Sequence, residues 1–263
     1  MRKLLSMLYL IALALFLSAC HEDQMFASLN QTIDNHLEHR ADTYQEQVDF
    51  FNNLAIDIIQ SAVAVYRHAS TGLATGSGVI FAVDETHYYA LTNNHVVYVE
   101  EGVSHYFRVH DYLGNIYSGE LVAQDHLYDL AVVRFQKDES RPALRLISMT
   151  TDNAVLDERI AIIGYPASQI NAITMGKVKG YQRITLSDTP PEVVDITFDV
   201  MAMDAPVKGG SSGSLVVNEA FELTGILYAG SRTSRVGNVM TSYAVPIEKV
   251  LEFLAKHGFE VSS

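Results

Sequence analysis

Three separated segments of the chain contain side chains that together could cleave an acyl bond. His95 follows a β-branched and aromatic run that ends in two asparagines, and Asp129 directly precedes an apolar run. Ser211 and Ser212 lie within Gly-Gly-Ser-Ser-Gly-Ser. A serine hydroxyl needs a base to take its proton, and a carboxylate can orient a histidine that acts as this base. Each segment alone also fits a structural role: a bystander histidine, an acid that caps a strand, and a flexible linker.

The serine-rich segment lies between two strand-like runs, which argues against a linker between domains. Its glycines allow backbone N–H groups to converge on one point, as an oxyanion hole requires. The segment also fits the G-x-S-x-G elbow of α/β-hydrolases, with Ser211 as the nucleophile. That fold needs alternating strands and helices, and an acid and then a histidine downstream of the serine. Glutamates and His257 do follow, but no aspartate does and the alternation is missing, so this alternative is disfavoured.

The elements that position these side chains are expected to be short strands, because apolar residues recur at every second position in short runs. Such runs predict strands at 62–67, 77–82, 87–92, 105–110, 117–123 and 129–135, and then at 144–148, 160–164, 174–182, 193–200, 214–218, 224–228 and 239–245. No long helical pattern interrupts them, and a final helix is expected over residues 246–257. The pattern therefore predicts an all-β body of two packed six-stranded antiparallel β-barrels that divide near residue 140.

The first twenty residues are typical of an export signal. A basic start precedes an apolar run that is too short to span a bilayer. The run ends in Leu17-Ser18-Ala19-Cys20, which resembles the bacterial lipobox, and Cys20 is the only cysteine of the chain. We expect a lipoprotein signal peptide over 1–19 and acylation of Cys20, which would anchor the protein in a membrane, facing away from the cytoplasm. A plain secretory signal and an uncleaved anchor are the alternatives.

Residues 20–60 carry apolar side chains at helical spacing without proline or glycine after His21. This pattern predicts a helical, lipid-anchored stalk. The stalk is either a spacer between membrane and body or a coiled coil that makes a homo-oligomer. The apolar positions do not keep a strict heptad, which favours the spacer.

Composition excludes several classes of protein. The 263 residues include 18 Lys and Arg against 31 Asp and Glu, a formal charge of −13 that opposes nucleic-acid binding. A single cysteine excludes an intramolecular disulfide and a cysteine-rich metal site, and no dinucleotide or P-loop motif is present. We expect neither a metal ion nor a cofactor.

The flanks of the three segments carry a family resemblance. Gly76-Ser77-Gly78-Val79 precedes Leu91-Thr92-Asn93-Asn94-His95-Val96, and Asp129-Leu130-Ala131 and the run from Asp204 to Val216 follow in order. This arrangement resembles the trypsin-like serine proteases and, among them, the bacterial HtrA (Deg) family. The resemblance covers about residues 61–257. It implies an N-terminal barrel over 61–140 with the histidine and aspartate, and a C-terminal barrel with the terminal helix over 141–263 with the serine.

By this resemblance, His95 is the base, Asp129 orients it and Ser212 is the nucleophile. The backbone N–H groups of Gly210 and Ser212 form the oxyanion hole. The resemblance places the substrate pocket at Pro206, Val207, Lys208, Tyr228, Ala229 and Gly230. No acid occupies the expected base of this pocket, so small or medium apolar side chains are expected there rather than lysine or arginine.

Several residues depart from the family pattern. Ser211 replaces an asparagine, and Ser214 and Leu215 replace a glycine and a proline. Leu227 occupies the position at which glutamate-specific relatives carry a histidine, and no PDZ domain is expected. With the expected lipid anchor, the resemblance implies a serine endopeptidase that acts on unfolded or exported proteins at the cell surface. A catalytically silent binding or chaperone module with the same fold is the alternative.

Overall fold

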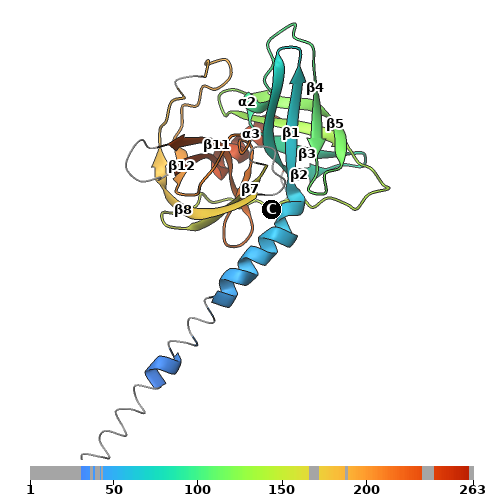
Figure 1. Ribbon diagram of the computed structural model, residues 1–263. Coiled ribbons are helices and arrows are strands. Elements are labelled where there is room, and N and C mark those ends of the chain that lie inside the picture. The colour runs from blue at the N-terminus through green and yellow to red at the C-terminus, as the bar shows by residue number, and fades with distance from the viewer. Residues whose placement is uncertain are drawn as a thin grey trace, which may run out of the picture. The chain divides into compact units, whose positions relative to one another are not determined.

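Two closed antiparallel barrels contain the twelve strands found among the described residues (Figure 1). The computed structural model describes residues 31–35, 38, 42, 44–165, 172–186, 189–232 and 240–260. The chain divides into two compact units, Met1–Asn52 and Asn53–Ser263, and both barrels belong to the second unit. The predicted all-β fold of two six-stranded barrels is thus confirmed.

The first barrel, teal and green in Figure 1, has the strand order β1-β2-β3-β6-β5-β4. Its strands are β1 (Ala62–Ala69), β2 (Gly72–Val83), β3 (His87–Thr92), β4 (His105–His110), β5 (Ile116–Asp125) and β6 (Leu130–Gln136). A single helical turn, α2 (Asn94–Val97), follows β3 directly. This turn places His95 at the end of the barrel where β6 begins.

The second barrel, yellow to red in Figure 1, has the strand order β10-β11-β12-β9-β8-β7. Its strands are β7 (Arg159–Gly164), β8 (Ala172–Gln182), β9 (Val200–Met203), β10 (Leu215–Val217), β11 (Leu223–Arg232) and β12 (Met240–Pro246). Ser212 therefore lies in the connection from β9 to β10, just before β10 begins.

Successive side chains of a strand point to opposite faces, and the inward-facing ones are mostly apolar and fill each barrel. Phe135 on β6 is 1% exposed, and its ring lies 5.6 Å from that of Tyr88 and 5.0 Å from that of Tyr117, measured between centroids. The second barrel has its own buried cluster, which includes Ile160, Met201 and Met203. Each barrel thus has its own hydrophobic core, and the predicted base, its partner and the nucleophile belong to neither core.

Two predicted strands do not form. Residues 144–148 are a connection between the barrels, in which Ile147 N–H donates to the carbonyl of Ile80 at 2.9 Å. Its buried residues Leu144 and Ile147 are three positions apart, so the segment lies against a barrel without the period of a strand. Within the predicted strand 193–200, only Val200 belongs to β9, because the amides of Val193 and Val194 turn back to the carbonyl of Pro190.

The C-terminal helix α3 (Ile247–Lys256) agrees with the predicted helix, and Pro246 is its N-cap. Val250 and Phe253 are buried, and Lys256 Nζ donates to Asp125 Oδ2 at 2.7 Å. This ion pair ties the end of α3 to the end of β5. The helix thus supports the β5–β6 loop, in which Asp129 lies.

Part of the predicted helical stalk lies within the described residues. Residues 31–35 and 44–56 are helical, and a short 3-10 turn, η1 (Ile58–Ser61), leads into β1. The predicted signal peptide and Cys20 lie outside the described residues. No helix in the described part of the chain is long and apolar enough to cross a membrane.

We predict that Phe135→Ala lowers the free energy of unfolding by about 3–5 kcal/mol, because it removes a buried ring and leaves a cavity. Urea unfolding of the full chain measures this loss. Leu73→Ala is the control, because Leu73 is 60% exposed and its truncation costs less than about 0.5 kcal/mol. Equal losses for the two variants would contradict the described core.

Candidate active site

His95 and Asp129 meet because β3 pairs with β6. The register places Thr92 opposite Ala131, so the residues just beyond these two strand ends become neighbours. Asp129 Oδ2 lies 2.7 Å from His95 Nδ1, and Asp129 Oδ1 accepts the backbone N–H of His95 at 2.9 Å. Residues 34 positions apart in the chain thereby form a doubly connected pair.

The Asp129 carboxylate is completely buried, whereas the His95 side chain is 25% exposed. Burial raises the pKa of Asp129 above its ordinary value, and hydrogen bonds from His95 and from the Asn94 amide oppose that rise. An ionised carboxylate only accepts hydrogen bonds, so Nδ1 of the ring carries the proton directed at it. Nε2 is then the nitrogen with a free lone pair, as a general base requires.

The two asparagines before His95 bind the segments that surround the His95–Asp129 pair. Asn93 Nδ2 donates to the backbone carbonyl of Asp129 at 2.9 Å, and Asn94 Nδ2 donates to the carbonyl of Val193 at 2.7 Å. Both asparagines are at most 2% exposed. The loop that contains Val193 comes from the second barrel, so α2 is bound to both barrels.

The segment 189–199 was not predicted to take part in the site. Besides Val193, it places the Asp195 amide 2.9 Å from the carbonyl of His126, and its Phe198 ring packs 6.0 Å from that of Tyr128. The segment 189–199 therefore contacts both the residue that precedes His95 and the residues that precede Asp129. No period or motif in the sequence signals such contacts, because they join residues more than sixty positions apart.

The loop before β10 has the backbone shape of an anion-binding turn. Ser211 N–H donates to the carbonyl of Lys208 at 3.1 Å, and Gly210 has a φ of 89°. A positive φ at the third position of a closed turn is typical of type II. The N–H groups of Gly210 and Ser212 donate to no backbone oxygen in the part of the chain that the structure describes. Both amides are therefore available to a ligand.

Ser211 and Ser212 differ in their surroundings. Ser211 is 5% exposed, and its hydroxyl oxygen accepts the Lys208 amide at 3.4 Å. Ser212 is partly exposed, and both serines line one hollow. A Cβ on Gly76 would lie 3.0 Å from the Ser212 carbonyl oxygen and 2.6 Å from the Val96 side chain, so Ser212 lies beside the turn that carries His95. The fold thus assembles all three predicted segments.

A hollow of about 260 Å³ adjoins Ser212. Its lining consists of Val207, Lys208, Gly209, Ser211, Ser212, Leu227, Ala229 and Gly230. Four of the six predicted pocket residues are among them. Pro206 is exposed and Tyr228 is buried, and neither belongs to this lining. Gly209 lines the hollow although the sequence analysis did not select it, and so does Leu227, which the sequence analysis placed at the position of the histidine in glutamate-specific relatives.

Val207, Leu227 and Ala229 give this hollow an apolar part, and its walls lie close together. A Cβ on Gly230 would lie 2.6 Å from Val207 Cγ2, so a larger residue at 230 would fill the space. Among the described residues that line it, Lys208 alone is charged. The hollow therefore suits a small or medium apolar group, with a positive charge at one side.

Tyr228 lies behind the site. The register of β11 against β12 shifts between Leu227 and Ala229, and such a bulge redirects the intervening side chain. Burial raises the pKa of Tyr228, and the charge of Asp129 adds to this rise. Tyr228 thus belongs to the surroundings of the buried carboxylate.

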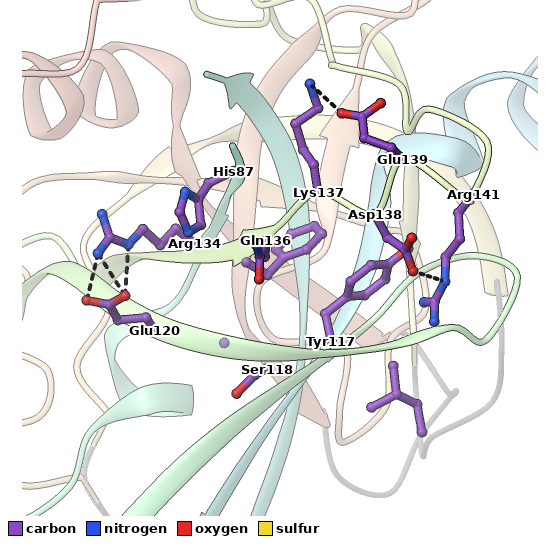
Figure 2. A pocket seen from close by; sticks show the side chains of 13 residues that line it. His87, Tyr117, Ser118, Glu120, Arg134, Gln136, Lys137, Asp138, Glu139 and Arg141 are labelled. Carbon is purple, nitrogen blue, oxygen red and sulfur yellow. Dashed lines mark hydrogen bonds and ion pairs between the residues drawn. The ribbon is translucent and has the colours of Figure 1, made fainter. Parts of the chain in front are cut away.

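A second hollow, of about 530 Å³, lies on the wall of the first barrel at β5 and β6 and contains none of the predicted site residues (Figure 2). Its cationic side chains are already paired, as the dashed lines of Figure 2 show for Arg134 with Glu120, Arg141 with Asp138, and Lys137 with Glu139. Little uncompensated charge remains there for a ligand.

Comparisons of sequence identify similar proteins. The family of trypsin-like peptidase domains matches residues 76–226. The chain is 30% identical over 189 residues to the serine protease Do-like HtrB of Bacillus subtilis, which covers 69% of this chain and 39% of that protein. It is also 30% identical over 179 residues to an HtrA-like serine protease of Staphylococcus aureus, which covers 66% of this chain and 22% of that protein. The chain thus spans well under half the length of these relatives.

Comparisons of structure agree as well. A crystal structure of the Rv3671c protease from M. tuberculosis in its active form is similar with a TM-score of 0.64 and 19% identity, over 81% of this chain and 87% of that chain. The serine endoprotease from Yersinia pestis is similar with a TM-score of 0.61 and 25% identity, over 79% of this chain and 66% of that chain. The first likeness supports the fold alone, and the second agrees with it.

We predict that Gly213→Ala destabilises the protein more than Gly102→Ala. Both glycines have a positive φ, 87° and 81°. A Cβ at 102 meets nothing within 4 Å, whereas one at 213 would collide with the Ser77 carbonyl oxygen. The loss in free energy of unfolding is about 1–2 kcal/mol at 102 and about 1–3 kcal/mol more at 213. Denaturant unfolding compares the two, and equal losses would contradict the close contact at Gly213.

Proposed function

The chain belongs to the family of trypsin-like peptidase domains, and from this premise we propose that it is a serine endopeptidase. The His95–Asp129 pair carries the proposal, because Asp129 engages Nδ1 of the ring and leaves Nε2 without a hydrogen-bond partner among the described residues, on a turn that lies beside Ser212. The two unengaged amides of that loop support it further. The similarity to HtrA-like serine proteases favours the same activity.

In the proposed reaction, Ser212 Oγ attacks the carbonyl carbon of a peptide bond while its proton passes to His95 Nε2. The carbonyl electrons move to oxygen, and the amides of Gly210 and Ser212 stabilise this oxyanion. Asp129 holds the ring and stabilises its positive charge. The C–N bond then breaks, His95 returns the proton to the leaving amine, and water hydrolyses the acyl-enzyme by the same route.

The hollow beside Ser212 would receive the side chain that precedes the cleaved bond. Its apolar walls at Val207 and Leu227 and its modest size favour small or medium apolar side chains. No carboxylate lines it among the described residues, so a lysine or arginine would find no counter-charge.

We propose that the substrates are unfolded or exported proteins at the cell surface. The lipobox at Cys20 supports a membrane-anchored protein that faces away from the cytoplasm, with the helical segment before β1 as its stalk. The net charge of −13 opposes binding to nucleic acid.

A fluorophosphonate probe tests the nucleophile. We expect the full chain and Ser211→Ala to react with the probe and Ser212→Ala to remain unlabelled, because only Ser212 would lie beside the base. Gel fluorescence after incubation at neutral pH measures the reaction, with circular dichroism as a control for folding. Absence of labelling in the wild type, with and without an added unfolded protein, would contradict the proposal and favour a silent binding module.

The reaction should depend on pH through the His95–Asp129 pair. Because burial raises the pKa of Asp129, its carboxylate takes up a proton at a higher pH than an ordinary aspartate does. The protonated carboxyl no longer stabilises a positive charge on the His95 ring, so the labelling rate should fall on the acidic side. Labelling rates from pH 4 to pH 8 measure this profile. A constant rate down to about pH 4, the ordinary pKa of an aspartate, would contradict a role of this pair in the reaction.

A further inference from the structure

Ser77 connects the first barrel to the loop of Ser212. It lies on β2 opposite Ala64, and no part of it is exposed. Its backbone N–H donates to the Ser212 carbonyl at 2.6 Å, and its hydroxyl donates to the Gly210 carbonyl at 2.9 Å. One residue thus binds the backbone on both sides of Ser211.

Two further contacts engage Ser77, and one of them bears on the direction of its hydroxyl bond. The Tyr165 amide donates to Ser77 Oγ at 2.9 Å, and Thr92 Oγ1 donates to the Ser77 carbonyl at 2.6 Å. An oxygen that accepts from an amide still has its own proton to give, and the Gly210 carbonyl can only accept. The Ser77 hydroxyl therefore has a defined donor role, and Thr92 links it to the strand that ends beside His95.

The bond to Gly210 constrains the turn that presents an oxyanion donor. The Gly210 N–H belongs to the central peptide of the turn Lys208–Ser211, and types I and II differ by a flip of this peptide. Glycine itself gives little preference between these conformations. A hydrogen bond to the next carbonyl along the chain restrains the rotation about Gly210. It therefore favours the arrangement in which the Gly210 amide is unengaged.

We propose that Ser77 is a positioning residue for the oxyanion hole and acts through the carbonyl of Gly210. This inference rests on the proposed serine endopeptidase activity. Ser77 touches neither substrate nor nucleophilic oxygen in this role. Loss of its hydroxyl leaves both oxyanion amides in place and removes the bond that orients one of them.

The test measures the kinetics of fluorophosphonate labelling for the full-length wild type, Ser77→Ala and Ser61→Ala. Ser77→Ala keeps the bonds that the Ser77 backbone makes with the Ser212 carbonyl and the Thr92 hydroxyl, and it loses the two hydroxyl bonds, to the Gly210 carbonyl and from the Tyr165 amide. Ser61→Ala is the matched control, because Ser61 is equally buried and its hydroxyl has no partner among the described residues. Rates over a range of probe concentrations separate the maximal labelling rate from the half-saturating concentration.

We expect Ser77→Ala to lower the maximal rate about ten- to hundred-fold, somewhat less than the loss of a whole oxyanion donor. The half-saturating concentration should change less than about two-fold, because the hollow that holds the probe is intact. Ser61→Ala should label as the wild type does. A merely structural role would lower the thermal stability of Ser77→Ala and leave the maximal rate of its folded fraction unchanged.

A maximal rate for Ser77→Ala within two-fold of the Ser61→Ala rate would overturn the inference and leave the proposed function intact. Failure of the wild type to label would instead overturn the proposed function itself. If Ser77→Ala does not fold, Ser77→Cys takes its place, because a thiol preserves the volume and donates weakly. A wild-type maximal rate in Ser77→Cys would then overturn the inference.

Discussion

The buried carboxylate of Asp129 is the interaction on which the rest of the site depends. A charge without access to water is tolerated only where hydrogen bonds replace its solvent. Here the ring and the backbone amide of His95 supply these hydrogen bonds, and the Asn93 side chain donates to the backbone carbonyl of Asp129. These donors come from the end of β3 and the turn α2, so the carboxylate orders the segment that carries the base. The first barrel must close in register for this pair to exist.

The two barrels divide the work of forming the site. The first supplies the proposed base, His95, and its partner Asp129 at strand ends, and the second supplies the loop of Ser212 before β10. Contacts that cross the junction align the halves: Asn94 binds Val193, and Ser77 binds Gly210 and Ser212. A rigid strand on one side thus restrains a glycine-rich loop on the other, which has little order of its own.

Much of this arrangement could be predicted from the sequence, because period-two patterns and short motifs are local. They indicated both barrels, α3, and the three segments that the fold brings together. Residues 144–148 were predicted as a strand because they include apolar residues, but they belong to no strand of either barrel. The prolines before Val193 begin a turn at a place where a strand was predicted. The roles of Val193 and Ser77 escaped prediction because they depend on contacts between distant segments. Such contacts leave no periodic signal.

The choice between the two adjacent serines follows from what the loop itself requires. Ser211 gives its amide to the Lys208 carbonyl, and its own carbonyl accepts the Ser214 amide at 2.9 Å. Its buried hydroxyl accepts the Lys208 amide, so the residue is engaged in closing the turn. A serine in place of the family's asparagine keeps a polar acceptor at this point. Ser212 has its amide unengaged and its side chain at the hollow, and these are the properties that a nucleophile beside an oxyanion hole needs.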